Sequence, residues 1–151
     1  MSAMDQLEVE VSVGEGVSPP VETARVEAAV RHVLVEEGVE EAEISVALVG
    51  DGEITALNAD YLEHEGPTDV ISFALHEAGE PPLGDVYVGV DQALRQAADF
   101  GATPAEEVLR LAMHGTLHVL GYDHPEGADR TGSEMFARQE ELLRAFLASA
   151  G

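Results

Sequence analysis

Three of the six histidines lie close together in residues 113–125, which read M-H-G-T-L-H-V-L-G-Y-D-H-P. His114 and His118 are four residues apart, so on a helix their side chains leave the same face, with Cβ atoms about 5–6 Å from each other. Gly121 can take the left-handed conformation that ends a helix and turns the chain back, which would bring His124 to the pair. The spacing therefore predicts that His114, His118 and His124 bind one metal ion.

The donor set indicates zinc and hydrolysis. The chain has no cysteine, so thiolate ligands and disulfide-linked partners are excluded, and imidazole suits Zn²⁺, although Ni²⁺ and Co²⁺ fit as well. Three imidazoles leave a fourth tetrahedral position for water, which loses its proton near pH 7 instead of ~15.7. The competing interpretation is that His114 and His118 merely belong to a buried apolar helix. The third histidine at this offset favours the metal site, with one Zn²⁺ per chain.

The spacing H-x-x-x-H-x-x-G-x-x-H also matches the zinc-binding helix of metzincin proteases. Those proteases need a glutamate directly after the first histidine as the general base, and this position is Gly115 here. Glycine can neither accept nor donate a side-chain proton. A peptidase, or a zinc hydrolase of another ester or amide, is therefore the weaker alternative.

The surrounding segments predict an α+β fold in a single domain covering residues 1–151. The first half has alternating or apolar runs typical of strands, whereas the second half has helical spacing. Thr103 and Pro104 have the residue types of an N-cap and a first helical position for the helix that carries the histidines. We expect strands at residues 9–13, 44–49, 70–74 and 85–90, and helices at residues 21–37, 53–61, 92–100, 104–120 and 132–148.

The charge balance is extreme, with 30 acidic residues, 7 arginines, no lysine and a formal net charge of −23. High salt screens such self-repulsion, because the Debye length falls to about 3 Å at 1 M, so we expect a halophilic source. The same charge argues against broad electrostatic binding of nucleic acid. No apolar run is long enough to span a membrane and the first thirty residues lack a basic signal region, so a cytoplasmic protein without a membrane partner is expected.

The run H-G-T-L-H-V-L-G-Y-D-H at residues 114–124 closely resembles the signature of the YbeY family. Similar blocks flank it: Leu57, Asn58 and Tyr61, then P-T-D-V-I-S-F at residues 67–73 and L-G-D-V at residues 83–86, and finally Met135 with Gln139 and Glu140. The resemblance covers most of the chain from about residue 44 onwards. It implies an α+β domain with a small mixed sheet of about four strands and about five helices.

The resemblance also implies an activity and partners. It points to a zinc-dependent, single-strand-specific endoribonuclease that acts in maturation of small-subunit ribosomal RNA and in ribosome quality control. Ribosomal RNA and ribosomal or ribosome-associated proteins would be its partners. A non-catalytic ribosome assembly factor that keeps the metal for structure remains a competing hypothesis.

Several further residues are assigned by the same resemblance. In this assignment a group of polar side chains would line the cleft and hold ligands or substrate: Thr68, Asp69, Ser72 and Asp85. Asp123 would orient an imidazole or cap the helix end. The competing interpretation is that Asp69 and Asp85 are turn or cap residues.

The chain departs from the family pattern after Tyr61. Family members usually carry an arginine at the next position, where this chain has Leu62. An arginine there would clamp a phosphate with two hydrogen bonds, which leucine cannot do. His64 offers a partial substitute or is an exposed loop residue.

Overall fold

The computed structural model describes residues 6–62, 68–122 and 134–149, and the strands in these ranges form one four-stranded sheet. The strands are β1 (Leu7–Val13), β2 (Ala42–Val49), β3 (Val70–Ala74) and β4 (Leu83–Gly89), in the spatial order β1-β2-β4-β3. Neighbours β1 and β2 are parallel, as are β2 and β4, whereas β3 runs antiparallel to β4. The sheet is therefore mixed, as predicted.

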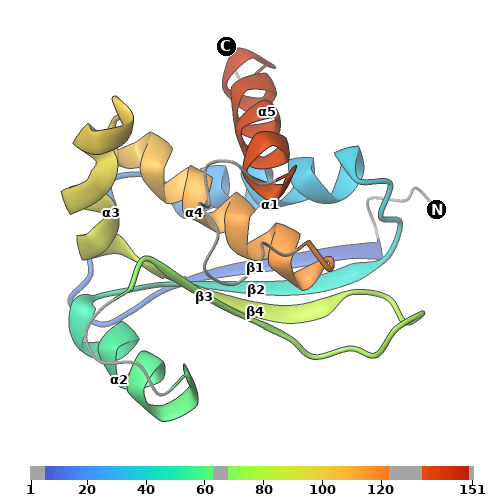
Figure 1. The fold of residues 1–151 in the computed structure, drawn as a ribbon, viewed down its shortest axis with the longest axis horizontal. Helices are drawn as coiled ribbons and strands as arrows, with labels where there is room; N and C mark the ends of the chain where they lie inside the picture. The colour runs from blue at the N-terminus through green and yellow to red at the C-terminus, as the bar shows by residue number, and fades with distance from the viewer. Residues whose placement is uncertain (1–5, 63–67, 123–133, 150–151) are drawn as a thin grey trace.

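Helices cover the two faces of the sheet unequally. The helices are α1 (Thr23–Glu36), α2 (Asp51–Leu62), α3 (Val90–Gln96), α4 (Pro104–Val119) and α5 (Glu134–Ser149), with a 3₁₀ turn η2 (Ala97–Phe100) after α3. Figure 1 shows α1, α4 and α5 on one face and α2 beneath the other. The α+β prediction is confirmed, and none of the helices in the described ranges is long and apolar enough to cross a membrane.

The strands expected at residues 9–13 and 44–49 begin earlier, at Leu7 and Ala42, and two further elements need correction. The strand expected at residues 85–90 begins at Leu83 and ends at Gly89, because Leu83 and Gly84 pair with residues of β2 instead of belonging to the preceding loop. The helix expected at residues 92–100 begins at Val90 and is an α-helix followed by η2. This 3₁₀ turn ends at Gly101, whose φ of 62° is left-handed.

The main core lies between the sheet and the helices α1, α4 and α5. Alternate residues of β1, β2 and β4 point into it, and Val9, Ile44, Val46 and Val88 are buried. A smaller cluster under α2 contains Val49, Ile54 and Ile71. The side of the sheet away from α4 is therefore covered mainly where α2 packs.

Helix α4 lies unusually close to the sheet at two glycines. A Cβ atom at Gly84 would come within 2.7 Å of Val119 on α4, and a Cβ atom at Gly115 would overlap with Val86 of β4. Only a residue without a side chain fits at either position. The two glycines thereby fix the height of the histidine-bearing helix above β4.

Candidate metal centre

Both ends of α4 are set by local sequence. At its start Thr103 accepts from the Glu106 backbone and Glu106 accepts from the Thr103 backbone, which is a capping box, with Pro104 at the first helical position. At its end Gly121 has a φ of 107°, and the backbone N–H of Tyr122 donates to the carbonyl of Leu117. The predicted cap and the predicted glycine turn are both confirmed.

His114 and His118 lie on the same face of α4. Their ring centroids are 5.0 Å apart with an interplanar angle of 74°, and His114 is 4% exposed whereas His118 is half-buried. His124 and Asp123 lie outside the described residues, so the predicted third ligand stays a prediction. Within residues 6–62, 68–122 and 134–149 there is no group of three metal-ligating side chains. The structure therefore brings together two of the three predicted ligands.

The orientation of His114 suits metal binding. Its Nδ1 lies 2.6 Å from Oε1 of Gln139 on α5. An amide oxygen only accepts, so Nδ1 carries the proton and donates it, which leaves the lone pair on Nε2. Metal-ligating histidines almost always donate their other ring N–H to such an acceptor. The residues present thus fit a metal ion at Nε2.

Gln139 had no assigned role in the sequence, although a signal existed. The buried residues of α5 include Met135, Leu142, Leu143 and Phe146. Gln139 falls on this apolar stripe and is 3% exposed. A polar side chain on an otherwise apolar helix face needs a partner. The stripe alone does not show that the partner is His114.

A buried ionic network lies next to this hydrogen bond. Arg110, one turn before His114, donates from Nε and Nη2 to the two carboxylate oxygens of Glu140 at 2.8 and 3.0 Å, and from Nη1 to Glu107. Burial raises the pKa of Glu107 despite opposing hydrogen bonds from Gln96 and Arg110. Burial also favours a higher pKa for Glu140, but the hydrogen bonds from Arg110 and Gln139 outweigh this effect, so the pKa of Glu140 is lowered. Glu140 is therefore ionised at neutral pH.

The network continues to Asp69, one of the residues assigned by resemblance. Gln96 donates from Nε2 to Glu107 at 2.6 Å and to Asp69 at 3.3 Å. The backbone carbonyl of Asp69 also accepts from Gly89 at 2.8 Å, next to the carbonyl of Thr68. Thr68 and Asp69 therefore lie where β3 and β4 adjoin α3. A series of hydrogen bonds links Asp69 to His114 through the side chains of Gln96, Glu107, Arg110, Glu140 and Gln139.

Ser72 and Asp85 lie on opposite faces of the sheet. Ser72 pairs with Val86, the residue that faces Gly115 of α4, so Ser72 is on the helix-bearing side. Asp85 pairs with Phe73 and alternates with Val86, so its side chain leaves the other face. The structure therefore does not place Asp85 beside His114.

Close packing at Gly115 affects the choice of reaction. A glutamate at this position, which the peptidase mechanism needs, would project from α4 straight into Val86 and Val70 of the sheet. The packing of α4 thus disfavours any general base directly after His114. The peptidase reaction is therefore disfavoured for two reasons: glycine supplies no general base, and a glutamate would not fit at this position.

The chain that leaves α4 is anchored to the neighbouring helices. A hydrogen bond to Glu37, with burial and the charge of Glu37 adding to it, raises the pKa of Tyr122. Arg138 of α5 donates to the same Glu37 at 2.7 Å. Glu37 therefore ties together the ends of α1 and α4 and the start of α5, immediately before the segment that holds His124.

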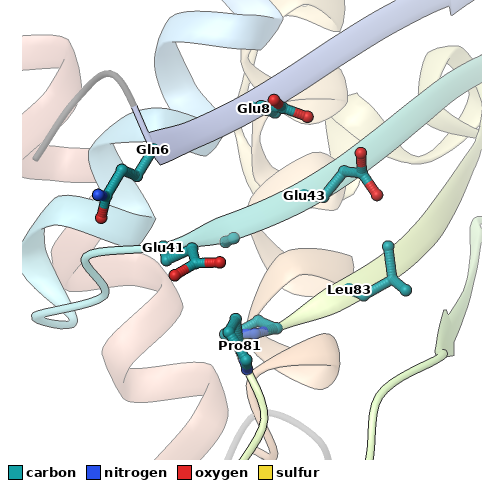
Figure 2. Close-up of a pocket in the computed structure, with 8 residues that line it drawn as sticks. Gln6, Glu8, Glu41, Glu43, Pro81 and Leu83 are labelled. Atoms are coloured by element: carbon teal, nitrogen blue, oxygen red, sulfur yellow. The ribbon is translucent and has the colours of Figure 1, made fainter.

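Most of the arginines in the described ranges are paired with carboxylates. In the described ranges four of them form ion pairs with carboxylates of the same chain, namely Arg31, Arg95, Arg110 and Arg138. On the open face of the sheet, Glu8, Glu41 and Glu43 line a pocket together with Gln6 and Leu83 (Figure 2). Phosphate would be repelled from that pocket.

These features define a class: a small α+β protein with a largely buried helix that carries two histidines on one face. The family model described as "Endoribonuclease YbeY" matches residues 16–147, and the chain belongs to this family. A relative from Desulfitobacterium hafniense, named Endoribonuclease YbeY, is 48% identical over 114 residues, which cover 69% of this chain and 71% of the relative. A relative of the same name from Bacillus licheniformis is 39% identical, covering 85% and 87%.

A solved structure is similar as well. The solution structure of TM1509 from Thermotoga maritima matches with a TM-score of 0.63 at 28% identity, covering 95% of this chain and 90% of that one. The match extends over nearly all of both chains, so the mixed sheet and the helices packed on it are shared.

Proposed function

We propose that the protein is a zinc-dependent, single-strand-specific endoribonuclease that acts in small-subunit ribosomal RNA maturation and ribosome quality control in the cytoplasm. Ribosomal or ribosome-associated proteins would be its partners. Membership of the family, whose relatives carry the name Endoribonuclease YbeY, supports the reaction. The observation that carries the metal centre is the histidine pair on α4, with Nδ1 of His114 bonded to Gln139.

Each residue of the centre has a separate task. His114, His118 and His124 would hold one Zn²⁺ through neutral imidazoles. Zn²⁺, when bound, supplies Lewis acidity toward the phosphodiester and activates the attacking water. The bond to Gln139 keeps His114 in the tautomer that binds through Nε2, and the paired glycines hold α4 against the sheet.

RNA recognition would depend on short-range contacts. With a net charge of −23 and four arginines engaged in internal ion pairs, the chain has little long-range attraction for phosphate. Direct hydrogen bonds, the metal ion and a ribosomal protein partner would instead bring the RNA to the site. High salt would weaken such binding less than it weakens that of a basic nuclease.

The test uses protein purified without a histidine tag, first analysed for bound metal and then loaded with Zn²⁺. We expect cleavage of single-stranded RNA and none of casein, and no cleavage by the His114→Ala variant. His32→Gln serves as the matched control, because His32 lies on α1 against Phe146 and outside the site. RNA cleavage by His114→Ala at the parent rate would reveal a contaminating nuclease and remove the support for this function.

A second function is favoured by one specific observation. Leu62 stands where the family usually has an arginine, so this chain lacks a phosphate clamp at that position. A ribosome assembly factor that keeps its metal for structure would need no such clamp. This second function is supported if the native protein cuts no RNA but still binds ribosomal particles. The Leu62→Arg variant then separates two causes: restored cleavage would show that only the phosphate clamp is missing.

A further inference from the structure

The buried amide of Gln139 has a defined direction. Its Oε1 lies 2.6 Å from Nδ1 of His114, and its Nε2 donates to Oε2 of Glu140 at 2.9 Å. An ionised carboxylate only accepts hydrogen bonds, so the amide nitrogen must face Glu140 and the amide oxygen must face the imidazole. A flipped amide would place the carbonyl of Gln139 against the carboxylate, with no proton between the two acceptors.

Glu140 is itself held in place. Two hydrogen bonds from Arg110 reach its two oxygens at 2.8 and 3.0 Å, in the paired geometry that guanidinium and carboxylate favour. Arg110 is 8% exposed and bonds also to the fully buried Glu107 of the same helix. The direction of the Gln139 amide is therefore imposed by the Glu140 carboxylate, which Arg110 of α4, the helix that carries the histidines, holds in place.

We infer that Gln139 is a positioning residue for His114 and that the Arg110–Glu140 pair sets the direction of its amide. This inference rests on the proposed metal centre. The amide oxygen keeps the imidazole proton on Nδ1, so the lone pair of Nε2 stays available to the metal ion. Without that acceptor the neutral ring would divide between two tautomers, and the form protonated at Nε2 cannot bind a metal through that atom.

The direct test is the tautomer of His114 in metal-free protein, measured by ¹⁵N–¹H correlation NMR of histidine-labelled samples above the titration range of imidazole. The parent is expected to show the proton on Nδ1. Gln139→Leu removes the acceptor and should give a mixture, whereas Gln139→Glu restores an acceptor and should restore the Nδ1 proton. The same tautomer in the parent and in Gln139→Leu would overturn the inference.

The second readout is zinc affinity from competition with a chelator. Loss of an outer hydrogen-bond partner typically weakens a metal site by about 10–100-fold, and we expect this for Gln139→Leu, with recovery in Gln139→Glu. Glu141→Gln is the matched control, because Glu141 is exposed on the same helix and pairs with Arg138 instead. An affinity loss equal in Glu141→Gln and Gln139→Leu would contradict positioning by Gln139.

The role of the ion pair is tested by Glu140→Gln, which keeps the shape of the side chain and removes its charge. A smaller preference for the Nδ1 tautomer than in Glu141→Gln supports the directional role, and an unchanged preference refutes it. Thermal unfolding of each variant verifies that it is folded. The two proposals fail separately: a parent that binds no zinc overturns the metal centre, whereas an unaltered tautomer in Gln139→Leu overturns the positioning.

Discussion

At the scale of single residues, the site depends on side chains whose roles are set by hydrogen bonds with their neighbours. His114 is suited to a metal because Gln139 accepts a hydrogen bond from its Nδ1–H, and Gln139 is oriented because Glu140 accepts a hydrogen bond from its amide nitrogen. Arg110 connects this chain of contacts to the buried Glu107. Arg110, which sequence reasoning gives no role, is thus part of the buried network that supports the site.

We expect Arg110→Met to destabilise the fold by about 3–5 kcal/mol at pH 7, because it leaves Glu107 and Glu140 without their counter-ion. The folded pKa of Glu140 is below its ordinary value of 4.5. Its ionised form therefore stabilises the parent above about pH 4.5, and this contribution is lost as the pH falls through the lower folded value.

Urea denaturation of parent and variant at several pH values measures this difference. The gap in unfolding free energy should be largest near pH 7 and should narrow below pH 4.5. A gap that stays constant down to pH 3 would show that the variant loses packing rather than an ion pair. Arg95→Met, which breaks an exposed pair with Asp51, is the control and should cost far less.

The histidine pair and the helix caps were predictable because each depends on residues that are close together in the sequence. The spacing of His114 and His118 determines a shared face, and Gly121 determines the turn. The bond between His114 and Gln139 was not predictable, since the residues are 25 positions apart on different helices. Asp85 shows a missed signal, because its alternation with Val86 and Val88 already indicates a different face from the core valines.

At the scale of elements, the packing of α4 on the sheet is set by glycines. Gly115→Ala should destabilise the protein, because overpacking costs about 1–3 kcal/mol and exceeds the gain in helix propensity of about 1 kcal/mol. Gly52→Ala is the matched control, since a Cβ atom at Gly52 in α2 meets nothing within 4 Å. It should leave stability unchanged or raise it.

The same packing predicts a compensating pair. Shortening the contacted side chain in Gly115→Ala, Val86→Ala should make the two substitutions cost less together than the sum of their separate effects in a double-mutant cycle. Chemical denaturation of the four proteins provides the cycle. Additive effects would mean that the helix moves away from the sheet without resistance from Val86.

At the scale of the whole molecule, the sheet brings negatively charged side chains together on its open face. Glu8 and Glu43 are register partners on β1 and β2, and both leave the open face (Figure 2). A side-chain hydrogen bond with Glu8, reinforced by the charges of Glu8 and Glu10, raises the pKa of Glu43. Ionising Glu43 therefore costs folding free energy, and stability falls as the pH rises through its folded pKa.

We expect the thermal midpoint to rise as KCl increases towards molar concentrations, as the hypothesis of a halophilic source requires. Glu43→Gln should raise the midpoint in dilute buffer and have little effect in 2 M KCl, where like charges are screened. Asp51→Asn should act in the opposite direction, because its hydrogen bonds from Arg95 lower the pKa of Asp51. A protein equally stable with and without salt would refute the hypothesis.

The hydrogen bond between His114 of α4 and Gln139 of α5 also affects how these two helices open. Helix α5 supplies none of the three predicted ligands, yet each transient opening that lifts Gln139 away removes the acceptor of His114. Ligand binding stabilises only the closed form, so zinc should slow amide hydrogen exchange in α5 as much as in α4. Exchange measured by mass spectrometry with and without zinc would show whether these two helices open as one unit.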